Sequence, residues 1–171
     1  CAKFNLTKND FPHFRTLHAT GYHGLGLKPT DVMSREDFRT LGRILGVDFD
    51  GADRTSVHDG ISIPSIGGSG AKYLQLVMRS VMRESTLDFE YNYEGDYSLH
   101  YSKLVQVEKQ LTEYKSKNSK VDFTDMIYQY VQIGEPPSLD LLIVDEAQDL
   151  TPLQWTMVEK MAESAEQVLI A

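Results

Sequence analysis

Residues 141–149 read Leu141-Leu142-Ile143-Val144-Asp145-Glu146-Ala147-Gln148-Asp149, so four apolar side chains run directly into a group of carboxylates. The apolar run is short, it ends in β-branched residues, and Pro136-Pro137 bounds it upstream. Such a run is typical of a strand buried on both faces inside a parallel sheet. The stretch therefore predicts an α/β fold.

The carboxylates that follow this strand indicate a chemical site. Unpaired charge is costly to bury, so Asp145 and Glu146 must lie at the C-terminal edge of the strand, where open α/β sheets bind ligands. An Asp there can hold Mg²⁺, and a neighbouring Glu can deprotonate a water for attack on a phosphoryl group. The alternative is an acidic turn after a core strand. It is disfavoured because Thr151-Pro152 opens a helix directly behind the carboxylates.

Composition excludes several classes of protein. The chain has 171 residues, 41% of them hydrophobic and 25% charged, which fits one globular domain with or without a small subdomain. A net charge of −8 argues against a broadly basic nucleic-acid surface but permits a local basic groove. Because Cys1 is the only cysteine, an intramolecular disulfide and a cysteine-based zinc site are excluded. No stretch reaches transmembrane length and no signal-peptide pattern is visible, so we expect a soluble, cytoplasmic protein without a membrane partner.

The N-terminal third mixes strand, helix and loop signals. Residues 14–18 predict a short strand, and residues 19–27 predict either a glycine-weakened helix or a loop. Ser34, followed three residues later by an Asp, is a capping-box pattern that predicts a helix, and Gly46 ends that helix. Residues 48–70 are rich in Asp, Gly and Ser and predict a surface loop, with at most a brief extended piece.

Three further helices are predicted by apolar residues at helical spacing. They carry Leu74, Val77, Met78 and Val81; Leu104, Val107, Leu111 and Tyr114; and Phe123, Met126, Ile127 and Tyr130, the last helix being capped by Asp122.

A βαβ unit is predicted at the C-terminal end. Thr151 and Pro152 suit the first positions of a helix, and residues 167–171 predict a second strand after it. Two strands joined through a helix indicate a parallel sheet. Because the chain opens without a methionine and stops on an apolar strand, we expect a fragment of a longer protein.

Three motifs resemble those of one family. Residues 142–149 resemble motif II of the UvrD/Rep-like superfamily 1 DNA helicases, in which a Gln, here Gln154, lies near the start of the next helix. Phe14-Arg15-Thr16-Leu17-His18 resembles the Thr-x-His motif of that family, and Val121-Asp122-Phe123-Thr124-Asp125-Met126 resembles the segment that returns the chain from an insertion. The order and spacing agree over nearly the whole chain.

The resemblance implies a fold and an activity. Residues 1–30 and 121–171 would form part of a RecA-like P-loop NTPase motor domain (1A), with a parallel sheet. Residues 31–120 would form its mostly helical inserted subdomain (1B). The implied parent is an ATP-dependent DNA helicase that couples MgATP hydrolysis to translocation on single-stranded DNA and duplex unwinding. Its partner would be single-stranded DNA or a junction of single and double strands.

The resemblance also assigns roles to residues. Asp145 would hold the Mg²⁺ of MgATP, and Glu146 would be the catalytic base. Gln148 would link the nucleotide state to the rest of the motor. Thr16 and His18 would lie at the DNA track.

The sequence departs from the family pattern because it has no Gly-x-x-x-x-Gly-Lys-[Ser/Thr] P-loop. The tempting candidate is Gly67-Gly68-Ser69-Gly70-Ala71-Lys72-Tyr73. It has an extra Ala before its Lys and a Tyr in place of Ser/Thr, and it follows the Thr-x-His motif instead of preceding it. We predict that it is a flexible loop. Since the phosphate cradle is missing, we expect that these residues do not turn over ATP alone.

Two alternatives stay open. One is a non-catalytic nucleic-acid-binding or protein-binding module derived from a P-loop ATPase. The other is a different P-loop ATPase, such as a recombination or repair factor, in which Gln148 would be accidental and the Thr16–His18 region would not contact single-stranded DNA.

Several other side chains have competing interpretations. A run of lysines could contact a phosphate backbone or form a solvated helix face. A group of tyrosines could stack on bases, but its acidic setting favours packing. The five histidines lack metal-ligand spacing, and His18 has a structural alternative at a strand end. The lysines are Lys103, Lys109, Lys115, Lys117 and Lys120; the tyrosines are Tyr91, Tyr93, Tyr97 and Tyr101, among Asp88, Glu90, Glu94 and Asp96.

Overall fold

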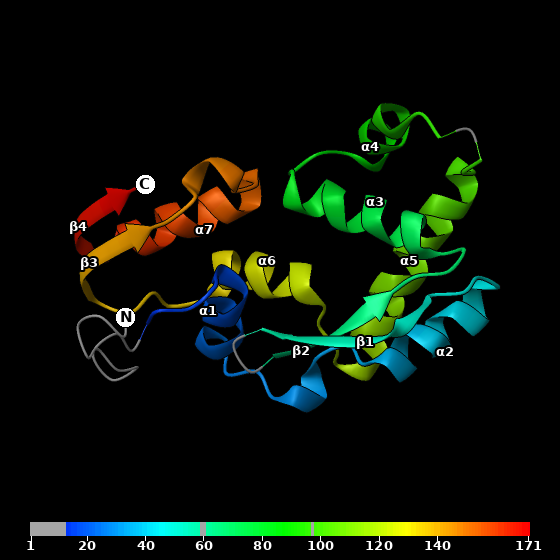
Figure 1. Cartoon of the computed structure of the whole chain (residues 1–171), viewed down its shortest axis with the longest axis horizontal. Coiled ribbons are helices and arrows are strands. Elements are labelled where there is room, and N and C mark those ends of the chain that lie inside the picture. The colour runs from blue at the N-terminus through cyan, green and yellow to red at the C-terminus, as the bar shows by residue number, and fades with distance from the viewer. Residues whose placement is uncertain (1–12, 59–60, 97) are drawn as a thin grey trace.

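The computed structural model describes residues 13–58, 61–96 and 98–171. Its elements, in chain order, are α1 Leu17–Gly24, η2 Pro29–Asp31, α2 Arg35–Leu45, β1 Asp50–His58, β2 Ile61–Ile66, α3 Ala71–Met82, α4 Leu87–Glu94, α5 Tyr101–Asn118, α6 Phe123–Ile133, β3 Leu139–Val144, η3 Ala147–Asp149, α7 Pro152–Ala162 and β4 Ala165–Ile170. Figure 1 shows β3, β4 and α7 at one end of the molecule, and α2 to α5 at the other.

Each end of the molecule has its own apolar core. The first core joins α2, α3 and α5, and the second packs α6 and α7 against one face of β3. The buried side chains of the first core include Phe38, Leu41, Leu74, Val77, Leu104 and Leu111; those of the second include Ile127, Tyr130, Leu142, Val144, Leu153 and Met157. The predicted helical stripes therefore face inward, although Val81 is exposed.

The chain passes between the two ends at one point, which we call the crossing. Val32 and Val121 form a parallel bridge there. The amide of Val121 donates to the carbonyl of Asp31 over 2.8 Å, and the amide of Met33 donates to the carbonyl of Val121 over 2.8 Å. A small cluster of Ala19, Val32, Val121 and Met126 covers the crossing. Segments far apart in sequence are thus fixed side by side.

Local sequence signals for helix ends are confirmed. The Ser34 side chain accepts from the amide of Asp37, whose carboxylate accepts from the Ser34 amide, and Gly46 ends α2 in the left-handed conformation at φ 65°. Asp122 and Asp125 form the same reciprocal arrangement at the start of α6. These caps satisfy amides that a helix leaves unpaired.

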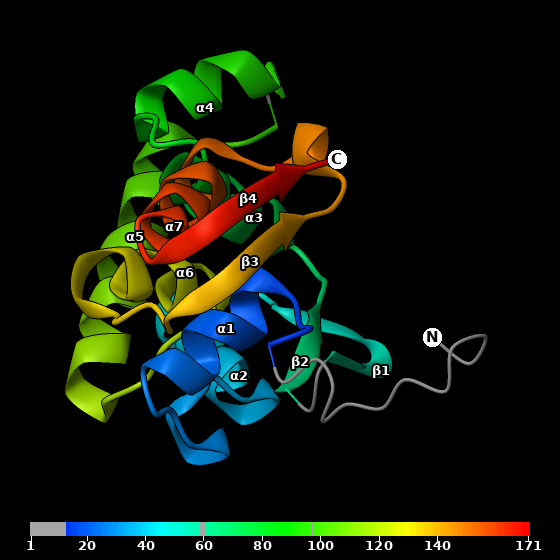
Figure 2. The same ribbon diagram turned by 90° about the vertical axis from the view of Figure 1, so that its left-hand side faces the viewer.

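The predicted parallel sheet is confirmed, but the predicted burial on both faces is wrong. β3 and β4 pair in parallel, with Val144 opposite Ile170. Leu142 and Val144 are buried, whereas Leu141 is 47% and Ile143 is 56% exposed. Figure 2 shows why Leu141 and Ile143 are exposed: the helices lie behind the strand pair, and its front face is open in the described residues.

The interpretation of residues 48–70 as a surface loop is wrong for most of the stretch, although the brief extended piece it allowed is present within β2, and residues 59 and 60 lie outside the described residues. β1 and β2 pair as an antiparallel hairpin, with His58 opposite Ile61 and Asp50 opposite Ile66 and an irregular register between. A backbone ladder supplies the hydrogen bonds, so the hairpin forms without an alternating apolar pattern.

The predicted strand at residues 14–18 is also wrong, because a helix begins at Leu17. Gly21 explains how α1 forms despite its glycines. A Cβ there would lie 2.5 Å from the carbonyl oxygen of Met126, so glycine allows α1 to approach α6 closely. Tertiary packing therefore outweighs the low helix propensity of glycine.

Three of the predicted basic residues are structural. Lys115 donates to Asp122 over 2.8 Å and to Asp125 over 2.9 Å near the crossing. Burial lowers the pKa of Lys115, but the two carboxylates outweigh this and raise it overall. Lys120 pairs with Asp37, and Lys103 donates to the carbonyl of Leu45.

The part of the chain that the structure describes contains no helix with the length and hydrophobicity of a membrane span.

We predict that Lys115→Met lowers the free energy of unfolding by about 3 kcal/mol, because it strands two largely buried carboxylates. Urea denaturation measures this change. Lys117→Met is the matched control, since its side chain is 76% exposed and its carboxylate partner Glu113 is 3.8 Å away; it should change stability by under about 0.5 kcal/mol. Equal effects of the two substitutions would contradict the structural role of Lys115.

Candidate functional site

The loop after β3 holds the predicted carboxylates at the C-terminal end of the strand. Two backbone hydrogen bonds to Ala171 fix it: Ala171 N–H donates to the carbonyl of Val144 over 2.9 Å, and Ala147 N–H donates to the carbonyl of Ala171 over 3.0 Å. Ala147 is buried and anchors the loop, while Asp145 and Glu146 are exposed. The carboxylates therefore face solvent from a fixed backbone.

Glu146 adopts a left-handed conformation, with φ 52° and ψ 41°. This conformation costs a residue with a Cβ roughly 1–2 kcal/mol, and it is more common at functional loops than elsewhere. The sharp turn lets the chain leave β3 and enter η3 within two residues. It also turns Glu146 away from the line of the strand.

Hydrogen bonds link the three residues predicted at this site, one of them through a backbone amide. The amide of Glu146 donates to Oδ1 of Asp145 over 3.1 Å, and Nε2 of Gln148 donates to Oε2 of Glu146 over 2.6 Å. Gln148 thus holds Oε2 of the Glu146 carboxylate, and no hydrogen bond or ion pair among the described residues involves Oε1. The structure brings all three predicted residues into one loop.

The electrostatics of the loop favour a cation. Among the described residues, no ion pair involves Asp145, Glu146 or Asp149. Three carboxylates within five positions therefore remain uncompensated and attract positive charge.

The helix after the loop begins as predicted at Pro152, behind Thr151. Oε1 of Gln154 accepts from the amide and the hydroxyl of Thr151, over 2.9 and 3.0 Å. Gln154 therefore fixes the start of α7 and, through it, the far side of the carboxylate loop.

Thr16 and His18 lie at the start of α1. Thr16 is the N-cap, and its hydroxyl accepts from the amide of Ala19 over 3.2 Å. The His18 ring lies 5.4 Å from the ring of Phe123, between centroids, and burial lowers the pKa of His18. The structure thus places Thr16 and His18 at the start of α1, on a different element from the carboxylate loop that follows β3.

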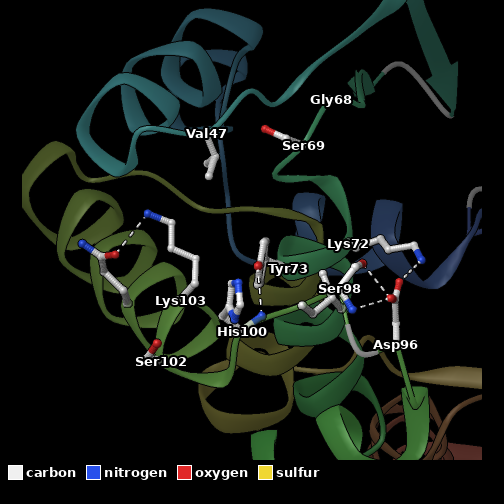
Figure 3. Close-up of a pocket in the computed structure, with 12 residues that line it drawn as sticks. Val47, Gly68, Ser69, Lys72, Tyr73, Asp96, Ser98, His100, Ser102 and Lys103 are labelled. Atoms are coloured by element: carbon white, nitrogen blue, oxygen red, sulfur yellow. Dashed lines mark hydrogen bonds and ion pairs between the residues drawn. The ribbon is translucent and has the colours of Figure 1, made fainter.

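Residues 67–70 of the glycine-rich segment form a hydrogen-bonded turn, and residues 71–73 are the first turn of α3. The amide of Gly70 donates to the carbonyl of Asp48 over 2.7 Å, and a Cβ on Gly68 would lie 2.6 Å from the same oxygen. Figure 3 shows Lys72 directed to Asp96, with which it forms an ion pair, beside a cavity of about 830 Å³. The ammonium group of Lys72 is thus already paired with a carboxylate of the same chain.

Sequence reasoning missed the roles of Arg79 and Arg83. Their guanidinium groups pair with Glu90, which is fully buried, and Arg79 also pairs with Glu94. The available signal was the spacing of the two arginines, which places them on one face of α3. It does not name their partners, because α4 packs against α3 only in the folded chain.

The fold and the site define an α/β protein with carboxylates at the end of a parallel strand. A family model for the UvrD/REP helicase N-terminal domain matches residues 10–171, and the chain therefore belongs to this helicase family. No curated protein and no solved structure matched the chain.

We predict that His18 makes stability depend on pH. Because its pKa is lowered in the folded state, the unfolded chain binds more protons, and stability falls as the pH drops through about 6.5. His18→Phe keeps a ring against Phe123 and should reduce the loss of unfolding free energy between about pH 7.5 and 5.5. The control His23→Phe alters an exposed ring and should retain the wild-type loss. An identical loss in His18→Phe and wild type would contradict this account.

Proposed function

We propose that this chain is the carboxylate-bearing part of an ATP-dependent DNA helicase, in which MgATP hydrolysis drives translocation on single-stranded DNA and duplex unwinding. The observation that supports it best is the joined set of Asp145, Glu146 and Gln148 at the C-terminal end of a parallel strand. Family membership supports the same activity.

Asp145 suits a Mg²⁺ ligand. Mg²⁺ keeps several waters and binds through one or two carboxylates together with substrate phosphates, so a full cage of protein ligands is not needed. Asp145 is exposed at the sheet edge and has no ion pair among the described residues. Bound Mg²⁺ would neutralise charge on the β- and γ-phosphate oxygens.

Glu146 suits the general base. Its backbone is held in an unusual conformation and one carboxylate oxygen is held by Gln148. The other oxygen can accept a proton from a water aligned with the γ-phosphate. Gln148 can also report the nucleotide state, because any shift of Glu146 changes their 2.6 Å hydrogen bond.

The proposed domains are a RecA-like part, residues 1–30 and 121–171, and an inserted part, residues 31–120. Two observations support this division. The crossing at Val32 and Val121 lies beside both boundaries, and the two apolar cores fall on either side of it.

The proposed DNA contact is the start of α1. Thr16 is exposed there, and the amides and dipole of a helix N-terminus attract phosphate oxygens. Because burial keeps His18 neutral near pH 7, it would act by hydrogen bonding rather than by charge. The proposed partner is single-stranded DNA or a junction.

We predict that the purified 171-residue chain hydrolyses no ATP above background, with or without single-stranded DNA, because its sequence has no P-loop. In the parent enzyme, Glu146→Gln should lower kcat of ATP hydrolysis by about 100-fold or more with MgATP binding retained. Glu163→Gln, at an exposed site after α7, is the control and should leave kcat unchanged. Hydrolysis by the chain alone, abolished by Glu146→Gln, would refute the first expectation. If Glu146→Gln left kcat of the parent enzyme unchanged, a non-catalytic module would be favoured.

We predict that an oligothymidylate carrying 4-thiothymidine crosslinks to the peptide that contains Thr16 and His18. Mass spectrometry of the digested complex locates the adduct. Thr16→Ser keeps the helix cap and should retain the crosslink, whereas Thr16→Ala loses the hydroxyl and about 1 kcal/mol of capping. Binding without any adduct in this peptide would favour a different P-loop ATPase.

A further inference from the structure

The acidic residues around α4 are largely neutralised within the fold. Glu90 is fully buried, where Ser85 Oγ donates to it over 2.6 Å and both Arg79 and Arg83 pair with it. Arg79 also pairs with Glu94 over 2.9 Å. Asp96 pairs with Lys72, so the acidic setting that argued against base stacking is weaker than the sequence indicates.

The tyrosines of this region separate into two kinds. Tyr91 is partly buried, its hydroxyl donates to the carbonyl of Leu99 over 2.8 Å, and its ring contacts Tyr101 edge-on. These two confirm the predicted packing role. Tyr93 is 66% exposed and takes no such part in the core. Tyr97 lies outside the described residues.

Tyr93 and Phe89 form an exposed aromatic pair on α4, which we call the α4 platform. The two rings are stacked, with centroids 6.0 Å apart and planes inclined by 17°, and Phe89 is 54% exposed. The guanidinium carbons of Arg83 and Arg79 lie 5.5 and 5.9 Å from the centroid of the Tyr93 ring. An exposed aromatic surface thus lies on α4, and two guanidinium groups lie over its Tyr93 ring.

The platform borders a cavity that reaches the start of α7. The cavity has a volume of about 770 Å³ and is lined by Phe89, Tyr93, Arg83 and Pro152, among others. Pro152 opens α7, directly after the loop that carries Asp145 and Glu146. Figure 1 shows the start of α7 facing the turn between α3 and α4.

We propose that the α4 platform stacks an unpaired nucleobase of single-stranded DNA beside the start of α7. Every base has a π-face, so aromatic rings hold single strands without sequence preference. The charge distribution fits a phosphate backbone, because the Arg83 side chain is 42% exposed whereas its partner Glu90 is fully buried. An approaching strand therefore meets the cation and not the carboxylate.

The proposal rests on the proposed binding of single-stranded DNA and adds a second contact to it. Asp88 is exposed and has no ion pair among the described residues, so the phosphates are assigned to the arginine side of the rings. A base held here would contact both α4 and the helix that follows the carboxylates.

The test uses fluorescence anisotropy of the 171-residue chain with a fluorescein-labelled oligothymidylate, and with an oligomer of equal length and charge made of abasic sites. We expect Phe89→Ala and Tyr93→Ala to weaken oligothymidylate binding roughly tenfold, and Tyr93→Phe to bind like wild type. The control Tyr128→Ala removes another exposed tyrosine, 47% exposed on α6, and should bind like wild type. The abasic oligomer should bind wild type and the alanine variants equally weakly.

The possible failures are distinguishable. If both alanine variants bind like wild type while Thr16→Ala binds weakly, the platform is refuted and the proposed DNA contact at α1 stands. If wild type binds both oligomers equally, the contacts are to the backbone and base stacking is refuted. If wild type binds neither oligomer, the proposed DNA contact fails as well. Thermal unfolding of each variant verifies its fold, which these exposed positions should leave intact.

Discussion

The arrangement of the whole chain depends on the ion pairs that Lys115 makes with Asp122 and Asp125. Asp122 has two functions, since it caps α6 by accepting from the amide of Asp125 and also pairs with Lys115 of α5. One carboxylate therefore fixes where α6 begins and how α5 approaches it. The crossing at Val121 lies next to this group, so the positions of both cores follow from it.

The carboxylate loop shows a second way of fixing a site. Among the described residues, Asp145 and Glu146 form no ion pair, and the backbone positions them through the bonds to Ala171 and the left-handed turn. A site fixed by backbone can leave its carboxylates open to a metal and to water. The loop is also short, because η3 and the start of α7, which Gln154 caps, follow it immediately.

The features that the sequence predicts correctly are those set by neighbours in the chain. Ser34, Gly46 and Asp122 act on amides and carbonyls within a few positions, and the strand–helix–strand order defines the parallel pair. The wrong predictions depend on contacts between distant segments. A helix begins at Leu17 within the stretch expected to be a strand, and Gly21, in the segment predicted as a helix or a loop, lets that helix approach Met126 closely. The β1–β2 hairpin and the exposed face of β3 likewise depend on which other segments pack against them in the folded chain. For the site, the motif placed Asp145, Glu146 and Gln148 in one loop, but it could not reveal that Glu90 is hidden behind arginines.

The crossing has a consequence for how the chain can change in length. Its two chain segments enter and leave the α2–α5 region side by side, held by two backbone hydrogen bonds. The entropy of closing a loop grows only slowly with its length, so residues gained or lost between those fixed ends cost little through closure itself. The region beyond the crossing can therefore be enlarged, trimmed or exchanged during evolution while α1, α6 and the strand that carries the carboxylates stay in place.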